Sequence, residues 1–170
     1  LVGSEMCIRD SNMMESVFEQ DSTAQVLFLV PEINLTPQLE SRVRSYFPDT
    51  SVVCLHSGLS QGERARSWLA MHERRAQILI GTRMSVFASI PNLKLIVVDE
   101  EHDLSYKAGD GIRYSARDLA VKRAQLMDIP VVLGSATPSL ETWAHVRAQR
   151  YRLLTLHHRA VKDAVLPTLE

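Results

Sequence analysis

The stretch Leu95-Ile96-Val97-Val98-Asp99-Glu100-Glu101-His102 joins four apolar residues directly to three carboxylates and a histidine. A continuous apolar run of this kind is typical of a strand in a parallel sheet that is covered on both faces. Ligands of open α/β sheets bind beyond the carboxyl ends of the strands. The stretch therefore predicts a buried strand that ends at a ligand site.

Similar apolar runs alternate with helical patterns along the rest of the chain. The other expected strands are residues 26–30, 52–55, 78–80, 131–133 and 151–156. The expected helices are residues 13–20, 36–47, 60–72, 83–87, 115–127 and 139–149. Thr36-Pro37 places a capping hydroxyl before a proline at the first helical position, and Ser60 to Glu63 is a capping box. The alternation predicts an α/β fold, a parallel sheet with helices on both faces.

The composition is that of an ordinary globular protein, with 45% hydrophobic and 23% charged residues among 170. No apolar run approaches the roughly 20 residues that cross a bilayer, which excludes a transmembrane helix. The net charge of −1 gives no indication of nucleic acid. Cys7 and Cys54 lie far apart and match no zinc-binding spacing, which favours a reducing, cytosolic setting.

The acidic cluster after the central strand predicts a metal-dependent site. Three adjacent carboxylates repel one another and need a compensating cation. Mg²⁺ takes oxygen ligands, with one or two carboxylates completing a shell of waters and substrate phosphates. We expect Asp99 to hold Mg²⁺ and Glu100 to polarise the attacking water. The alternative is a solvated acidic turn.

Two further segments are candidates for the same site. Gly134-Ser135-Ala136-Thr137-Pro138-Ser139 follows the strand at 131–133, and its small residues allow close approach to the acidic cluster. A glycine turn followed by a helix cap at Ser139 would have the same sequence. In the segment 105–114, two tyrosines are suited to stacking on bases, two basic residues to reaching phosphates, and glycines to movement. The alternative for this segment is an ordinary mobile surface loop.

Four segments resemble the motifs of superfamily 2 helicases. Residues 99–102 resemble the Walker B box (motif II), and residues 135–137 resemble motif III. Residues 30–38 (VPEINLTPQ) resemble motif Ia, and residues 81–83 (GTR) resemble motif Ib. Within the superfamily, the chain resembles the primosomal replication-restart helicases. The strings that carry this closer resemblance are VPEINLTPQ, LHSGLS (55–60), IGTRMSVF (80–87), VVDEEHDLSYK (97–107), RYSARDLAVKRA (113–124) and GSATPSLET (134–142).

The resemblance implies a RecA-like P-loop NTPase lobe that uses ATP with Mg²⁺. It implies a monomeric 3′-to-5′ DNA helicase of the bacterial cytoplasm, which acts at stalled forks and initiates primosome assembly. The implied partners are forked or single-stranded DNA, other primosome proteins and single-strand-binding protein, with no membrane. Asp99 would hold Mg²⁺ through the nucleotide, and Glu100 would activate water. The residues implied to contact nucleotide or couple hydrolysis to DNA are Glu101, His102, Ser135, Ala136 and Thr137.

The DNA-binding residues implied by the motifs and by the loop are Pro31, Thr36, Gly81, Thr82, Arg83, Tyr106, Lys107, Arg113 and Tyr114. For Arg83 the local chemistry agrees, because a guanidinium suits a phosphate. A surface ion pair is the alternative for this arginine.

The sequence departs from this family in one respect that concerns ATP. It contains no G-x-x-x-x-G-K-[ST] string, whose amides and lysine would bind the phosphates. The family carries that string upstream of motif Ia, where residues 1–11 lie here. We expect residues 1–12 to be a non-native or disordered tail, 13–160 the first motor lobe, truncated by the missing phosphate loop, and 161–170 the start of the next segment. The family's zinc ligands are not among these residues.

Two functions are compatible with these observations. The first is a fragment of an ATP-dependent helicase that is inactive in isolation. The second is a catalytically dead helicase-like lobe that acts as a DNA-binding or protein-interaction module.

Overall fold

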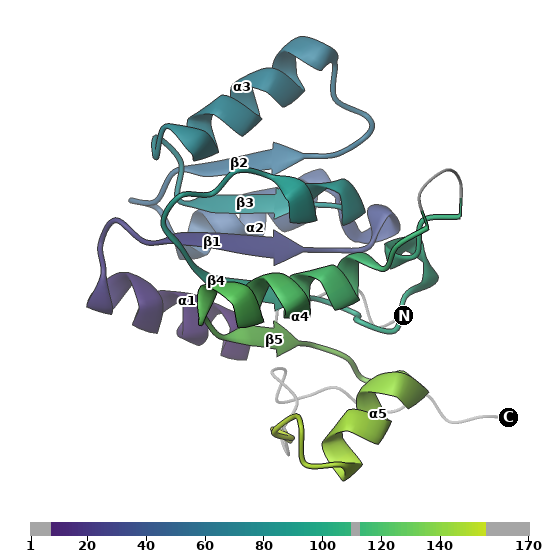
Figure 1. The fold of residues 1–170 in the computed structure, drawn as a ribbon. Helices are drawn as coiled ribbons and strands as arrows, with labels where there is room; N and C mark the ends of the chain where they lie inside the picture. The colour runs from purple at the N-terminus through teal and green to yellow at the C-terminus, as the bar shows by residue number, and fades with distance from the viewer. Residues whose placement is uncertain (1–7, 110–112, 156–170) are drawn as a thin grey trace, which may run out of the picture. The chain divides into compact units, whose positions relative to one another are not determined.

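Five parallel strands form one sheet in the described part of the chain, which comprises residues 8–109 and 113–155 of a computed structural model (Figure 1). Their order across the sheet is β2-β3-β1-β4-β5, and every neighbouring pair is parallel. The strands are β1 (Gln25–Leu29), β2 (Val52–Leu55), β3 (Ile78–Gly81), β4 (Leu93–Val98) and β5 (Val131–Leu133).

Helices cover both faces of this sheet, which confirms the predicted fold class (Figure 1). The α-helices are α1 (Ile8–Gln20), α2 (Pro37–Tyr46), α3 (Gln61–His72), α4 (Ala116–Met127) and α5 (Leu140–Arg147). Short 3-10 helices are η1 (Glu32–Asn34), η2 (Arg83–Phe87) and η3 (Leu104–Tyr106). Residues of α1 and α2 form one core cluster with the sheet, and residues of α3, α4 and η2 form the other.

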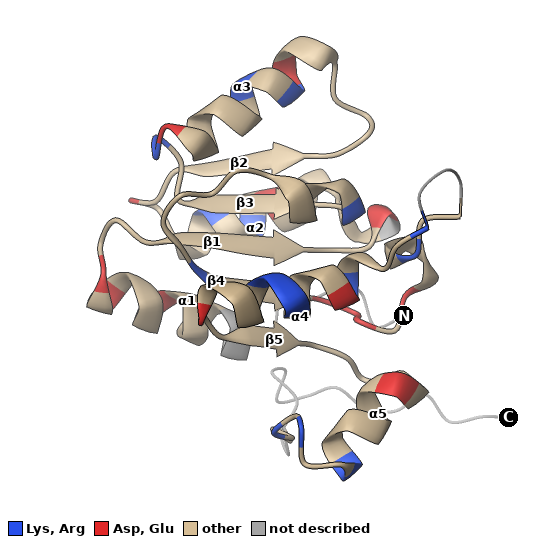
Figure 2. Cartoon of the chain, viewed as in Figure 1, with Lys and Arg blue, Asp and Glu red and all other residues tan. Residues whose placement is uncertain are grey.

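Alternate residues of one strand supply the two clusters. Leu27 and Leu29 of β1 belong to the cluster under α3 and α4, whereas Val26 and Phe28 belong to the cluster under α1 and α2. β1, β2, β3 and β5 carry no charged residue, and their ribbons in Figure 2 are uncharged throughout. Complete burial of each valine, leucine, isoleucine or phenylalanine side chain contributes about 1.5–3 kcal/mol to the stability of the fold. The apolar runs therefore correspond to strands that are fully buried in β1 and β3, whereas β5 and most of β2 are half-buried.

The predicted helix starts at Thr36 and Ser60 are confirmed. The Thr36 hydroxyl accepts a hydrogen bond from the Leu39 amide at 3.3 Å, and Pro37 is the first residue of α2. At the start of α3, the Ser60 hydroxyl and the Glu63 carboxylate cap each other's backbone amides. These caps satisfy amides that have no partner within the helix.

The helix end expected at residues 13–20 is confirmed, and the helix extends further toward the N-terminus. α1 starts at Ile8 and ends at Gln20. The expected tail at residues 1–12 therefore overlaps the first turns of α1, and residues 1–7 lie outside the described part. Ser11 is buried although its neighbourhood lacks an apolar pattern, because the helix packs against the sheet.

The strand expected at residues 151–156 was wrong for the residues that are described. Tyr151–Thr155 belong to no strand, and Leu156 lies outside the described range. The amides of Arg150 and Tyr151 bond back to the His145 carbonyl at 2.9 and 3.3 Å, so they close the end of α5. The Tyr151 ring packs on His145 at 4.8 Å. Local helix-end bonding therefore outweighs the apolar pattern of this run.

The chain divides into two compact units, Leu1–Pro138 and Ser139–Glu170. The first contains the sheet with α1 to α4, and the second contains α5, which the Ser139 hydroxyl caps by accepting from the Thr142 amide at 3.2 Å. The expected boundary after residue 160 and the segment 161–170 lie outside the described residues. In the described part, no helix is both long and apolar enough to traverse a bilayer.

Candidate functional site

The parallel sheet brings loops from distant parts of the sequence to one edge. All five strands end on the same side, at the arrowheads in Figure 1. The acidic box follows β4, and the segment 134–137 follows the neighbouring strand β5. The predicted residues of motifs Ia and Ib follow β1 and β3. Sheet topology therefore places all four segments along one edge.

Asp99 is held by two backbone hydrogen bonds and one side-chain hydrogen bond. Its amide donates to the Leu29 carbonyl of β1 at 2.9 Å. Its carbonyl accepts a hydrogen bond from the Tyr106 hydroxyl at 2.7 Å. Its Oδ1 accepts from the Glu100 amide at 3.0 Å. These bonds fix the position of a half-buried carboxylate at the end of β4.

Glu100 turns the chain sharply away from the strand. Its φ of 44° lies in the left-handed region. A non-glycine residue there costs on the order of 1–3 kcal/mol, and such strain is concentrated at functional sites. The Glu100 carbonyl accepts from the Asp103 amide at 2.8 Å, which stabilises the turn.

His102 joins the acidic box to the loop after β5. Its Nδ1 lies 2.7 Å from the Ser135 Oγ and 3.5 Å from the Glu100 Oε2. The Ser135 hydroxyl also accepts from the Thr137 amide at 3.0 Å. Ala136 and Thr137 are exposed beside it. The two segments that sequence reasoning placed on neighbouring strand ends are therefore in direct contact.

Backbone hydrogen bonds reinforce this contact. The Glu101 amide donates to the Gly134 carbonyl at 2.9 Å, and the Gly134 amide donates to the Val98 carbonyl at 2.8 Å. Movement of either loop therefore disturbs the other.

The Glu101 carboxylate points away from the exposed edge and is buried against Arg117 of α4. The Arg117 guanidinium donates to Glu101 Oε2 at 3.1 Å, and the two side chains are 9% and 1% exposed. Burial opposes the charge of Arg117, but its hydrogen bonds and charge interactions with Asp118 and Glu101 outweigh burial and raise its pKa. Two of the three carboxylates of the box therefore remain near the surface, and the third belongs to a buried ion pair.

Sequence reasoning gave Arg117 no role. One signal was available, because Arg117 lies in the first turn of a helix capped by Ser115. A cation is disfavoured near a helix N-terminus unless a specific anion compensates it.

The structure corrects the prediction for Tyr106. This ring is only 1% exposed and belongs to the core cluster under α3 and α4, so neither of its faces is available to a base. Burial, together with the negative charges of Asp99, Asp103 and Glu100, raises the pKa of its hydroxyl, which stays protonated and donates to Asp99. An aromatic residue between polar neighbours looked like a loop residue because its tertiary contacts are absent from the sequence.

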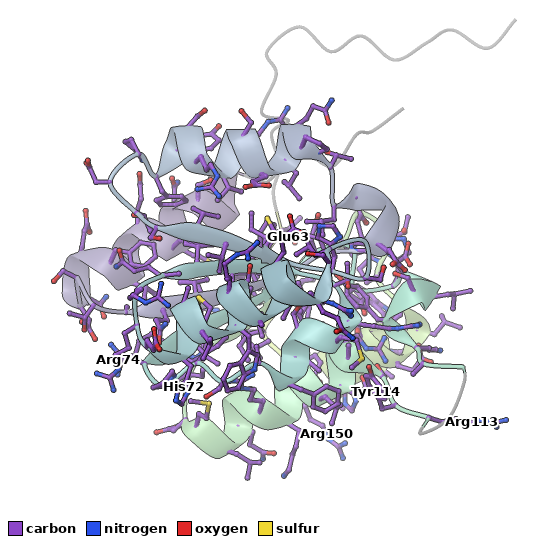
Figure 3. The ribbon with its side chains drawn as sticks, turned by 90° about the horizontal axis from the view of Figure 1, so that it is seen from above. Glu63, His72, Arg74, Arg113, Tyr114 and Arg150 are labelled. Atoms are coloured by element: carbon purple, nitrogen blue, oxygen red, sulfur yellow. The ribbon has the colours of Figure 1, made fainter. Side chains whose placement is uncertain are left out.

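The loop after η3 is closed by antiparallel pairing and lies against η2. Lys107 forms a bridge with Ser115, and the Ala108 amide donates to the Tyr114 carbonyl at 2.8 Å. The Arg83 guanidinium donates to the Lys107 carbonyl at 3.4 Å. In Figure 3 the Arg113 side chain extends away from the body of the protein, whereas Tyr114 lies against it. Residues 110–112 lie outside the described part.

The remaining predicted residues have mainly structural surroundings. Gly81 lies over Ser85, whose hydroxyl donates to the Leu55 carbonyl at 3.0 Å. Thr82 and Pro31 are buried, and Thr36 caps α2. Sequence reasoning also missed a contact on the same edge, a hydrogen bond from the Ser57 hydroxyl to Glu32.

No group of three or more histidine, cysteine, aspartate or glutamate side chains that could hold a metal ion occurs in the described residues. One or two carboxylates with phosphate and water ligands suit Mg²⁺ bound to a nucleotide. The half-buried Asp99 and Glu100 fit that donor set.

Comparison with known sequences gives matches over most of the chain. Residues 9–146 match the DEAD/DEAH box helicase family. The chain is 44% identical over 143 residues to Replication restart protein PriA of Bacillus subtilis (strain 168), covering 84% of this chain and 18% of the relative. It is 45% identical over 145 residues to the protein of the same name in Haemophilus influenzae, covering 85% and 20%. The chain thus spans about a fifth of the length of these relatives.

Solved structures with the same fold are more distant in sequence. S. cerevisiae Dbp5 bound to RNA and ADP BeF3 aligns with a TM-score of 0.55 and 17% identity, covering 82% of this chain and 35% of that one. The Pyrococcus furiosus Hef helicase domain aligns with a TM-score of 0.51 and 9% identity, covering 81% and 27%. These likenesses show the fold alone, a RecA-like helicase lobe.

Proposed function

The chain belongs to the DEAD/DEAH box helicase family, and we propose that it forms part of the first motor lobe of a replication-restart helicase. In this proposal the whole enzyme couples ATP hydrolysis to 3′-to-5′ unwinding of DNA at stalled forks and starts primosome assembly. Its partners are forked or single-stranded DNA, other primosome proteins and single-strand-binding protein. The observation that carries the proposal is the direct contact between the acidic box and the segment 134–137 at the strand ends.

In this proposal Asp99 and Glu100 divide the hydrolytic work. The Asp99 carboxylate holds Mg²⁺ together with the phosphates of ATP. When bound, Mg²⁺ supplies positive charge to the phosphate oxygens. The Glu100 carboxylate orients the attacking water and accepts its proton. The hydrogen bonds of Asp99 and the turn at Glu100 support these roles, because they hold both carboxylates beside one strand end.

The coupling of hydrolysis to DNA depends on the loops beside the acidic box. The contact between His102 and Ser135 supports this coupling, because a nucleotide-dependent shift of the acidic box would be passed to the segment 134–137. Arg83, Lys107 and Arg113 contact phosphates of the strand, and the loop at Pro31–Thr36 contacts its backbone. The bond from Arg83 to the Lys107 carbonyl supports a common surface for these cations.

The test uses the polypeptide encoded by the complete reading frame around these 170 residues. We expect DNA-stimulated ATP turnover, and we expect Glu100→Gln to lower kcat by about 10²–10⁴-fold, the usual contribution of a general base. Glu100→Gln should retain nucleotide binding because it keeps the shape of the side chain. Asp99→Asn should raise the Mg²⁺ concentration needed for half-maximal turnover. Glu73→Gln, at the exposed residue that directly follows α3, is the matched control.

Full turnover by Glu100→Gln would overturn the assigned role. DNA binding by the complete polypeptide without any ATP turnover would instead favour the catalytically dead module. Unwinding of a forked DNA substrate, measured by strand displacement, separates a helicase from an ATPase that only translocates.

A further inference from the structure

Two exposed apolar side chains and a half-buried tyrosine form a cluster where η2 meets the loop before α4. Phe87 and Met84 of η2 are 57% and 60% exposed, although both are large and apolar. The Tyr114 ring meets the Phe87 ring edge-on, with centroids 5.1 Å apart and an interplanar angle of 72°. The Tyr114 hydroxyl donates to the Met84 sulfur at 2.9 Å. Phe87 and Met84 are outside every role assigned above.

The contacts hold the Phe87 ring in a fixed place without covering it. The Tyr114 backbone is held in place by the bond from the Ala108 amide to its carbonyl, next to the bridge between Lys107 and Ser115. The Arg123 guanidinium of α4 donates to the Val86 carbonyl at 2.7 Å, which anchors the end of η2. A rigid aromatic ring loses little conformational entropy when a flat partner stacks on it.

The two segments that carry the cluster also carry cations. Arg83 begins η2, and its guanidinium reaches the backbone of Lys107 at 3.4 Å. The Lys107 and Arg113 side chains are exposed. Single-stranded nucleic acid is bound by this combination, in which aromatic faces stack on bases and basic groups follow the phosphates.

We infer that Phe87 is a base-stacking platform for single-stranded nucleic acid, with Tyr114 and Met84 as its supports. One base stacks on the open part of the Phe87 ring, and the adjoining phosphates lie toward Arg83 and Lys107. The inference rests on the proposed function for the nature of its ligand. Its test is an equilibrium binding measurement without nucleotide, so that its failure is separable from a failure of the hydrolytic proposal.

The test is fluorescence anisotropy of the 170-residue chain with labelled oligothymidylate of about 20 nucleotides, longer than one typical single-strand site. Phe87→Ala should weaken binding by about 5- to 100-fold, the measured range for loss of one stacked base. Phe87→Trp should bind as tightly as the wild type, and Phe87→Leu should behave like Phe87→Ala. Trp68→Ala removes an exposed aromatic residue of α3 and should leave binding unchanged.

Two further measurements separate stacking from charge. With an abasic oligonucleotide of the same length, Phe87→Ala and wild type should bind equally. Phe87→Ala should keep the wild-type salt dependence, whereas Lys107→Gln should lower the slope of log K against log salt by about 0.7. Parallel titrations with oligouridylate show whether the platform serves DNA, RNA or both.

Three results would overturn the inference. If Phe87→Ala weakened binding to the abasic oligonucleotide as much as binding to oligothymidylate, the effect would come from contacts with the nucleic-acid backbone and not with a base. If Trp68→Ala weakened binding as much as Phe87→Ala does, the effect of Phe87→Ala would not be specific to this ring. Wild-type affinity of Phe87→Ala for oligothymidylate would exclude a base on this ring. Thermal unfolding checks that each variant is folded, which we expect because most of the Phe87 side chain is exposed.

Discussion

Single residues of the acidic box differ in what surrounds them. Asp99 and Glu100 are half-buried at the edge of the sheet, whereas Glu101 is buried beside Arg117. A buried carboxylate requires a compensating cation, because the loss of hydration is costly. Glu101 and Arg117 therefore fix the acidic box to α4, and the neighbouring carboxylates stay accessible to ligands.

Loss of the Arg117 guanidinium should destabilise the fold. Arg117→Ala removes the cation that faces the buried Glu101 carboxylate, and we expect a loss of about 3–5 kcal/mol in the free energy of unfolding. Arg117→Lys should lie between this variant and the wild type, because an ammonium lacks the fork geometry of a guanidinium. Urea unfolding measures the stability of both Arg117 variants, with Arg64→Ala at an exposed position of α3 as the control. A loss no larger than that of the control would mean that the pair contributes little.

Cys54 should make stability depend on alkaline pH. Burial, reinforced by the charge and hydrogen bond of Glu40, raises the pKa of its thiol from 9.0 to about 12. The folded state therefore binds the proton more tightly than the unfolded state. This contribution to stability is fully present below pH 9 and is lost as pH rises toward 12.

The comparison of wild type with Cys54→Ala tests this dependence. The free energy of unfolding between pH 8 and pH 11 should fall more steeply for the wild type than for Cys54→Ala, each by urea titration at fixed ionic strength. Parallel pH profiles would show that the thiol ionises normally in the folded protein.

Among the elements, the junction of β3 with η2 shows why particular small residues occur in a motif. A Cβ added to Gly81 would lie 1.9 Å from the Ser85 Oγ and 3.0 Å from the Leu55 carbonyl. Ser85 is itself buried and bonded to that carbonyl, so it has no room to retreat. The glycine thus lets η2 turn directly over β3 and β2, which positions both Arg83 and Phe87.

Two glycine-to-alanine variants should have opposite effects. Gly81→Ala should lower the free energy of unfolding by about 1–3 kcal/mol, as overpacking of a tight contact does. Gly62→Ala, in the exposed helix α3, meets only Arg66 at 3.6 Å and should raise it by up to about 1 kcal/mol. Thermal and urea unfolding provide the comparison. Equal stability of the two variants would show that the β3–η2 junction adapts more easily than its geometry indicates.

At the scale of the whole molecule, the parallel sheet collects the candidate site from segments that are far apart in sequence. Residues 31, 83, 99 and 135 follow four different strands that share one edge. A nucleotide-hydrolysing site also needs groups that bind phosphates, and these 170 residues contain no G-x-x-x-x-G-K-[ST] string. The carboxylates proposed to act in hydrolysis, Asp99 and Glu100, are therefore present in this chain without that phosphate-binding loop.

The 170-residue chain should therefore show no ATP turnover above background, with or without single-stranded DNA. Phosphate release at saturating Mg-ATP measures this directly, with the complete polypeptide as the positive control. The chain should nevertheless bind oligothymidylate, because the contacts proposed for DNA do not depend on the phosphate loop. DNA-stimulated turnover by the 170 residues would show that another group replaces the missing lysine.

The sequence by itself determined the elements that depend on local chemistry. Apolar runs at residues 26–30, 52–55 and 95–98 predicted strands covered on both faces, and hydroxyls at Thr36 and Ser60 predicted helix starts. It also placed the acidic box and residues 135–137 on strand ends, because ligand sites of parallel sheets lie there. These inferences succeeded because periodicity and capping are properties of neighbouring residues.

The tertiary structure alone decided the partners of individual side chains. Tyr106 is a buried donor to Asp99, although its polar neighbours suggested a surface loop. Arg117 pairs with Glu101, and Phe87 is exposed against Tyr114. Burial depends on which segments the topology brings together, and hydrogen-bond partners lie many residues apart in the chain. The local sequence pattern specifies neither burial nor hydrogen-bond partners. The roles of these residues are therefore decided only when the sheet and helices are assembled.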